Sequence, residues 1–146
     1  MMSYQQVDIL LVEDSSADAE MTLRTLKKRG IANTVEWVRN GVEALDFLFC
    51  QNAYAGRPTG HPRMVLLDLK MPLMDGLQVL ERMKSDPRTR TIPVVMMTSS
   101  REEGDLLASY RLGVNSYVVK PVDFGDFADM VSQVGMYWMI SNQTTE

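Results

Sequence analysis

The sequence predicts an α/β fold in which a doubly wound, five-stranded parallel sheet carries helices on both faces. Short apolar segments alternate with amphipathic segments of helical length along the chain, a pattern typical of repeated βα units. Segments 64–68 and 92–97 are almost wholly apolar, as expected for strands whose two faces are both covered. Several apolar segments end abruptly in polar residues, and strand ends of this kind commonly form the ligand-binding edge of such sheets.

The strands follow from the apolar runs and the helices from the amphipathic segments between them. In chain order, we expect strands near residues 7–12, 33–38, 64–68, 92–97 and 115–119, and helices near 16–29, 41–51, 75–85, 102–112 and 123–140. Gly30 follows three basic residues and ends the first helix. Asp86-Pro87 ends the third helix and Gly113 the fourth. Asp123 can cap the start of the fifth helix.

Composition indicates one globular domain spanning 1–146, because a chain of 146 residues with 45% hydrophobic residues can bury a core without covalent staples. The net charge of −4 disfavours a nucleic-acid-binding protein. A lone Cys50 excludes an internal disulfide and fits a reducing cytoplasm. The first residues resemble neither a signal peptide nor a membrane span, so we expect a cytoplasmic protein.

No second domain is indicated by the pattern. Residues 51–63 contain two glycines and two prolines and read as a long, turn-rich connection that is too short for a domain linker. After the fifth helix only residues 141–146 remain. We therefore expect a domain core over about residues 6–140 with no output domain attached.

Polar groups follow four of the apolar runs and form a candidate site. Glu13 and Asp14 follow the first run, Asp68 ends the third, Thr98 follows the fourth and Lys120 follows the fifth. Because the carboxyl ends of parallel strands meet at one edge, these five side chains are expected to converge. The alternative is that each acid merely ends a strand and faces solvent separately, and that Thr98 bonds to local backbone.

The composition of this site indicates phosphoryl chemistry on Asp68 with a divalent cation. Carboxylates held close together repel by about 1 to 4 kcal/mol per pair unless a cation binds, and hard oxygen ligands favour Mg²⁺. A carboxylate such as Asp68 can accept a phosphoryl group, with Lys120 and Mg²⁺ neutralising charge and Thr98 donating a hydrogen bond. Lys120 precedes Pro121, and a cis bond there would turn the lysine toward the site.

At these residues the chain closely resembles the receiver domain of two-component response regulators. The matching motifs are Val12-Glu13-Asp14, Leu66-Leu67-Asp68-Leu69-Lys70-Met71-Pro72 with Asp75-Gly76, Met97-Thr98-Ser99, and Tyr117-Val118-Val119-Lys120-Pro121. The resemblance implies a flavodoxin-like strand order 2-1-3-4-5. It also implies a signalling module in which a histidine kinase or phosphotransfer protein phosphorylates Asp68.

The same resemblance implies roles for individual residues. Mg²⁺ would be bound by Asp14, Asp68 and the backbone carbonyl of Lys70, with Glu13 acting largely through water. Thr98 and Tyr117 would form the switch pair. Within the family, the chain looks like the stand-alone receivers related to phytochrome-associated response regulators, on the basis of Glu13-Asp14-Ser15-Ser16-Ala17-Asp18, the long loop before Asp68, the segment 109–117, and the aromatic pair Tyr137-Trp138.

Two other functional classes remain to be weighed. An aspartyl-phosphate phosphatase would typically need a second acid two residues after its nucleophile, where this chain has Lys70. A pseudo-receiver acting only as a scaffold is opposed by the intact set of site residues. His61 lies between Gly60 and Pro62 in a loop and is expected to be a surface residue.

We expect signalling through protein docking on the fourth and fifth helices, to a downstream target and also as a homodimer. The predicted core stripe of the last helix follows 3/4 spacing: Phe124, Phe127, Val131, Val134 and Trp138. The apolar residues left off this stripe are Met130, Met136, Tyr137 and Met139. They would leave more exposed apolar surface than a monomeric helix normally has. The alternatives are that a lengthened helix caps the edge of the sheet without a partner, or that a kinase or target uses this surface.

Overall fold

The computed structural model describes residues 7–28, 34–57, 60–109, 113–114 and 116–133. Within them the chain alternates strands and helices in the expected order. The elements are β1 (Ile9–Val12), α1 (Ser16–Lys28), β2 (Val35–Val38), α2 (Gly41–Leu48), the 3₁₀ helix η1 (Asn52–Tyr54), β3 (Met64–Asp68), α3 (Gly76–Lys84), β4 (Val94–Thr98), α4 (Arg101–Ser109), β5 (Ser116–Val119) and α5 (Phe124–Gln133).

The five strands form one parallel sheet in the order β2-β1-β3-β4-β5, which confirms the predicted doubly wound, flavodoxin-like topology. The register aligns the strand ends. Val12 lies opposite Leu67 in the β1–β3 pair, and Asp68 lies opposite Met97 in the β3–β4 pair. Residues that directly follow β1, β3 and β4 therefore emerge at the same edge of the sheet.

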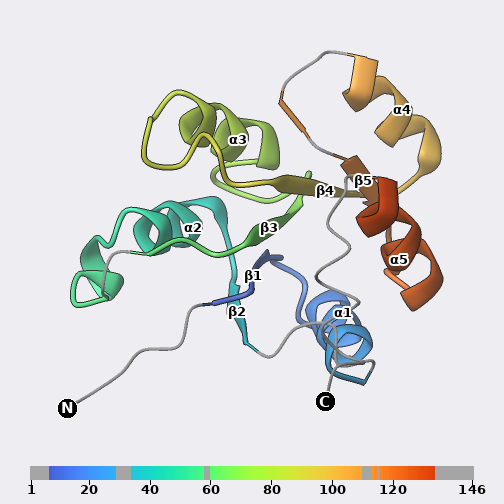
Figure 1. The fold of residues 1–146 in the computed structure, drawn as a ribbon, viewed down its shortest axis with the longest axis horizontal. Coiled ribbons are helices and arrows are strands. Elements are labelled where there is room, and N and C mark those ends of the chain that lie inside the picture. Colours follow the sequence, from blue (N-terminus) through green and yellow to red (C-terminus); the bar gives the residue numbers. More distant parts are fainter. Residues whose placement is uncertain (1–6, 29–33, 58–59, 110–112, 115, 134–146) are drawn as a thin grey trace.

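Helices lie on both faces of the sheet (Figure 1), and a hydrophobic cluster fills the space on each face. Helices α1 and α5 cover one face, where Leu26 and Phe127 are fully buried with alternate residues of β1, β3 and β4. Helices α2 and α3, together with Leu107 of α4, cover the other face. Every residue of β1, β3 and β4 is buried, as the nearly continuous apolar runs predicted.

Some element boundaries differ from the predicted ones for local reasons. Helix α2 ends at Leu48 rather than near residue 51, because Cys50 and Asn52 take positive φ values of 54° and 51° that are incompatible with a continuing helix. Strand β4 begins at Val94, directly after Pro93, which has no N–H to donate to a ladder. The predicted helix ends at 29, 110–112 and 134–140 lie outside the described residues.

The prediction for Met130 of α5 was wrong. Met130 is buried at 2% exposure among the residues of the α1/α5 layer, instead of lying off the core stripe. A helix that covers a sheet needs an apolar face wider than a single 3/4 stripe, and Met130 belongs to that wider face with Phe127. Met136, Tyr137 and Met139, with Val134 and Trp138 of the predicted stripe, lie outside the described residues.

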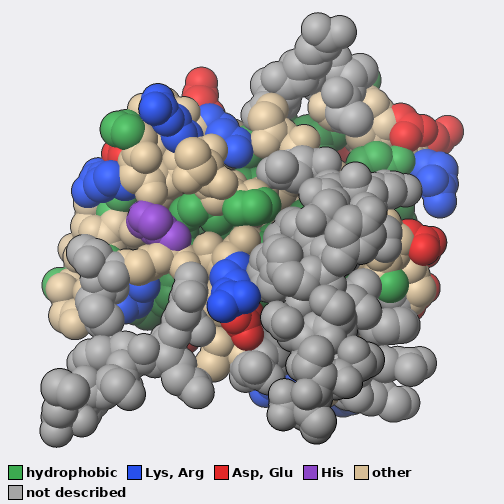
Figure 2. All heavy atoms as spheres, viewed as in Figure 1, with side chains coloured by type: hydrophobic (Ala, Val, Ile, Leu, Met, Phe, Trp, Pro, Cys, Tyr) green, Lys and Arg blue, Asp and Glu red, His purple; other side chains and the backbone are tan. Residues whose placement is uncertain are grey.

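Two further features agree with the sequence. Among the described helices, none is both long and apolar enough to cross a membrane. His61 is exposed, and its purple side chain is visible on the surface in Figure 2.

Gly76 at the start of α3 is expected to be a site where any side chain destabilises the fold. A Cβ there would stand 2.5 Å from the backbone carbonyl oxygen of Asp68 and 3.0 Å from Leu69 Cα, and backbone cannot move away cheaply. We expect Gly76→Ala to lower the free energy of unfolding by about 1–3 kcal/mol, measured by urea denaturation. Gly56→Ala is the control, because nothing lies within 4 Å of its Cβ position. Equal stability of the two variants would contradict the predicted close contact.

Candidate functional site

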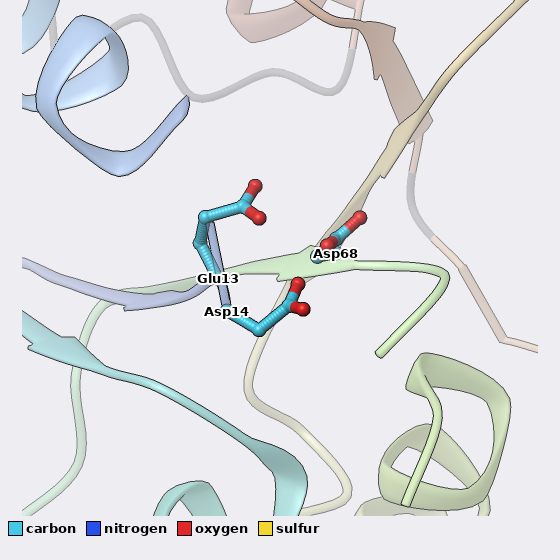
Figure 3. A group of neighbouring side chains, drawn as sticks. All are labelled: Glu13, Asp14 and Asp68. Atoms are coloured by element: carbon cyan, nitrogen blue, oxygen red, sulfur yellow. The ribbon is translucent and has the colours of Figure 1, made fainter. Parts of the chain in front are cut away.

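Three carboxylates gather at the carboxyl edge of the sheet. Glu13 and Asp14 follow the last residue of β1, and Asp68 is the last residue of β3. One carboxylate oxygen from each lies within 4.8 Å of the others, and Figure 3 shows the three side chains together at the ends of these strands. Glu13 and Asp68 are buried, whereas Asp14 is exposed. The site is therefore an acidic cluster with two buried carboxylates and one that is open to solvent.

Lys120 reaches this cluster from beyond the end of β5. Its Nζ lies 3.3 Å from Asp68 Oδ1, 3.2 Å from Glu13 Oε1 and 3.1 Å from Asp18 Oδ2. The Lys120–Pro121 peptide bond is cis. Asp18 lies in the first turn of α1 and was missed in the sequence analysis. The sequence could have indicated this role, because Asp18 lies five residues after Glu13, on the helix that starts at the same edge of the sheet.

The charge distribution at the cluster perturbs two groups in opposite ways. Burial, reinforced by the charge of Glu13, raises the pKa of Asp68 from 3.8 to about 7, while Lys120 acts in the opposite direction. For Lys120, burial lowers the pKa, but the hydrogen bond to Asp18 and the charges of Asp68 and Glu13 outweigh it and raise the pKa. Lys120 thus remains a cation at any physiological pH. Asp68, in contrast, gains or loses its proton at a pH of about 7.

Glu13 is fixed by neighbours that the sequence analysis did not identify. The Trp37 indole N–H donates to the backbone carbonyl of Glu13 at 2.9 Å, and the Ser15 backbone N–H donates to Glu13 Oε2 at 3.1 Å. The Trp37 bond holds the Glu13 backbone, and the Ser15 bond orients the Glu13 carboxylate, whose other oxygen contacts Lys120. The position of the acid is thus set by β2 and by the β1–α1 connection together.

Thr98 ends β4, next to the strand that carries Asp68. Its side chain is buried, and its hydroxyl donates to the backbone carbonyl of Ser100 at 3.0 Å. The local backbone bond weighed as an alternative in the sequence analysis is therefore present in this structure. The Thr98 hydroxyl can donate a hydrogen bond to a group attached to Asp68 only after its bond to Ser100 is broken.

Tyr117 of β5 is held against α4. Its hydroxyl donates to Asp105 Oδ1 at 2.6 Å, and its ring occupies the space where a Cβ on Gly104 would lie. Neither Gly104 nor Asp105 was identified in the sequence analysis, because the contact depends on how α4 lies over β5. Tyr117 thus adopts one defined orientation, which α4 stabilises.

The donor set fits a hard divalent cation. Carboxylates with one solvent-exposed member suit Mg²⁺ or a similar ion that retains waters, and the excess of acids over Lys120 leaves negative charge for it to neutralise. Lys70 follows Asp68 by two residues, and its side chain forms an ion pair with Glu103 at 3.0 Å. The use of the Lys70 carbonyl as a ligand stays a prediction. Cys50 and His61 are not members of the acidic cluster.

The raised pKa of Asp68 is expected to be observable in the metal-free protein. We expect its carboxyl carbon to titrate near pH 7 in NMR spectra, with Glu13→Gln moving the midpoint down and Lys120→Met moving it up. Between about pH 4 and 7 the folded protein holds a proton that the unfolded chain has lost, so this group lowers stability as pH rises through that window. An Asp68 midpoint near the ordinary value of 3.8 would contradict this account.

Comparison with known proteins identifies the family. The model described as the response regulator receiver domain matches residues 9–132. The structure of the bacteriophytochrome response regulator AtBRR is 51% identical, with a TM-score of 0.86, covering 92% of this chain and 96% of that one. Response regulator Rcp1 of Synechocystis sp. (strain PCC 6803) is 40% identical over 131 residues, covering 90% of this chain and 88% of Rcp1.

Two solved structures of such relatives show a metal-bound and a phosphorylated form. The Mn²⁺-bound form of Rcp1 has a TM-score of 0.71 and 38% identity, covering 92% of this chain and 95% of that one. The phosphorylated cyanobacterial phytochrome response regulator RcpA has a TM-score of 0.71 and 33% identity, covering 97% of this chain and 98% of that one. These similarities confirm the expected likeness to phytochrome-associated response regulators. With its sheet topology and its family match, this chain belongs to the response regulator receiver domain family, the signalling modules that interact with histidine kinases or phosphotransfer proteins.

Proposed function

We propose that this receiver is a phosphorylation-controlled binding module whose phosphoacceptor is Asp68. The observation that carries the proposal is the position of Lys120 Nζ, which lies 3.3 Å from Asp68 within a cluster of three carboxylates. A cation held at that distance can pair with a phosphoryl oxygen once Asp68 is modified. The phosphorylated state of the relative RcpA supports the same chemistry.

The transfer reaction forms one bond and breaks one. An oxygen of the Asp68 carboxylate attacks the phosphorus of a phosphohistidine on a kinase or phosphotransfer protein, and the P–N bond breaks as the new P–O bond forms. The imidazole leaves with the bonding electron pair and is protonated by solvent. Lys120 stays charged throughout and pairs with the phosphoryl oxygens, while Glu13 and Asp18 hold its ammonium in place.

Mg²⁺ is the proposed cation of this site. Asp14, Asp68 and the Lys70 carbonyl would hold it directly, and Glu13 would act largely through water. When bound, it would supply neutralisation of the charge that builds up between the donor phosphate and the carboxylates. The Mn²⁺-bound form of Rcp1 supports divalent-metal binding in a close relative.

The proposal includes no turnover of an external substrate. The protein would catalyse only its own phosphorylation and dephosphorylation, and we place it in the cytoplasm. An aspartyl-phosphate phosphatase remains disfavoured because Lys70 stands at the position of the second acid, and its ammonium is paired with Glu103. A single receiver domain over 1–146 without an output domain stays a prediction.

The docking face is proposed to lie on α4, β5 and α5. A groove of about 310 Å³ runs there, lined in part by Arg101, Tyr117, Asp126 and Asp129, and Leu106 of α4 is 56% exposed. This mixture of apolar and charged groups suits a protein target. A homodimer through the same face stays a prediction, and the burial of Met130 removes one of the residues on which it was based.

The switch is proposed to couple Thr98 to Tyr117. Both side chains are occupied elsewhere in the present structure, Thr98 by the Ser100 carbonyl and Tyr117 by Asp105. Release of Thr98 toward a phosphoryl oxygen would vacate space beneath α4, into which the Tyr117 ring can turn. Two states separated by a few kcal/mol are enough for such a response.

Phosphorylation of Asp68 is the first test. We expect incubation with acetyl phosphate and Mg²⁺ to add the mass of one phosphoryl group, measured on the intact protein, and we expect Asp68→Asn to abolish the gain. Asp75→Asn is the matched control, because Asp75 is an acid at the start of α3 that caps a helix. If Asp68→Asn gained as much mass as the unmodified protein, Asp68 would not be the phosphoacceptor.

The switch has a separate test in Gly104→Ala. A methyl group at this position would occupy the space of the Tyr117 ring, so the substitution should shift the ring toward its phosphorylated-state position. The ¹⁹F NMR signal of 3-fluorotyrosine at 117, assigned with Tyr117→Phe, should move in the direction that Mg²⁺ and beryllofluoride produce.

Gly125→Ala on α5 is the control for Gly104→Ala, since its Cβ would meet nothing closer than 3.5 Å. A Tyr117 signal that does not respond to beryllofluoride in the unmodified protein would refute the coupling.

A further inference from the structure

Glu103 of α4 holds two donors that flank the acidic site. Its Oε1 accepts hydrogen bonds from the Ser99 backbone N–H at 2.9 Å and the Ser99 hydroxyl at 3.2 Å. Its Oε2 pairs with the Lys70 ammonium at 3.0 Å, and the Glu103 side chain is only 17% exposed. Ser99 directly follows Thr98, and Lys70 lies two residues after Asp68. One carboxylate thus ties the connection after β3 to the connection after β4.

The Ser99 N–H faces the Asp68 side of β4 because of the ladder geometry. Leu69 N–H donates to the Met97 carbonyl, so in a parallel ladder the next rung would run from Ser99 N–H to the Leu69 carbonyl. That carbonyl instead accepts from Gly76 N–H at 2.9 Å. The Ser99 N–H therefore lies just beyond the last hydrogen bond of the β3–β4 ladder, on the side of β3, which carries Asp68. It donates to the Glu103 carboxylate instead.

Helix capping explains only part of this arrangement. Ser100 accepts the Glu103 N–H through its hydroxyl at 3.1 Å, as in the first half of a capping box. In the usual second half, the acid reaches back to the N–H of the capping residue itself. Glu103 reaches one residue further, to Ser99, and adds the ion pair with Lys70. Capping needs neither the shift nor the negative charge, because Gln serves at that position as well.

We propose that the Glu103 carboxylate is an internal anion that competes with the phosphoryl group on Asp68 for Ser99 N–H and for the Lys70 ammonium. A phosphoryl group brings nearly two negative charges and three strong acceptor oxygens. The two donors that Glu103 holds lie on the connections that follow Asp68 and Thr98, and neither takes part in the sheet ladder. The Thr98 hydroxyl at the end of β4 is bound to the same connection through the Ser100 carbonyl. Glu103 thereby stabilises the unphosphorylated arrangement of the β4–α4 connection, and phosphorylation must displace it. This inference rests on the proposed function.

The Glu103→Gln variant distinguishes competition with the phosphoryl group from simple helix capping, because Gln can cap the helix but carries no negative charge. The dissociation constant of beryllofluoride, a phosphoryl mimic, is measured at saturating Mg²⁺ by calorimetry. Because a charge-assisted pair is lost only from the unliganded state, we expect Glu103→Gln to bind about tenfold more tightly than the unmodified protein. The affinity for Mg²⁺ alone should stay within about twofold, since Glu103 is not a member of the acidic cluster.

Glu102→Gln is the matched control. It removes the same charge one residue earlier, from an exposed side chain in the same helical turn, and its beryllofluoride affinity should match that of the unmodified protein. An unchanged or weakened affinity in Glu103→Gln, or an equal gain in both variants, would overturn the competition while leaving the proposed function intact. Absence of binding by every variant, together with absence of labelling by acetyl phosphate, would overturn both.

Discussion

The contact between Lys120 and the buried acids is the interaction on which the rest of the site depends. Glu13 and Asp68 are carboxylates removed from water, and each would be costly to hold there without a compensating charge. Lys120 supplies one positive charge that Glu13, Asp18 and Asp68 share. With Asp14 included, four carboxylates face one ammonium, so negative charge remains uncompensated. Burial is the main cause of the raised pKa of Asp68, and the charge of Glu13 adds to it. The remaining negative charge makes a divalent cation the natural complement of the site.

The fold makes this contact possible by aligning strand ends that are distant in sequence. The register of β1 with β3 brings the residues after Val12 beside Asp68, and the lysine reaches them from beyond β5, across the end of β4. The helices then limit what each group can do. Helix α1 contributes Asp18, and the close approach of Gly76 in α3 fixes the backbone at Asp68. Helix α4 contacts the β4–α4 connection through Glu103 and Tyr117 through Gly104 and Asp105.

Much of this architecture could be predicted because short stretches of the sequence determine it. The apolar runs located all five strands, and the polar residues at their ends predicted which side chains would gather. Asp18, Glu103 and Asp105 were not predicted, because their partners lie on other elements and the pairings depend on helix placement. Met130 was misassigned because one 3/4 stripe is too narrow a description of a helix on a sheet. The early end of α2 depends on positive φ at Cys50 and Asn52. Asparagine often adopts this conformation, but cysteine gives no signal for it.

The most direct test of the account is a crystal structure of the protein with Mg²⁺ and beryllofluoride. The account predicts beryllium attached to a carboxylate oxygen of Asp68, with Lys120 Nζ within hydrogen-bonding distance of a fluorine and the metal held by Asp14 and Asp68. Beryllofluoride attached to any other residue would contradict it. A Lys120 side chain turned away from the fluorines while Asp68 is occupied would contradict it equally.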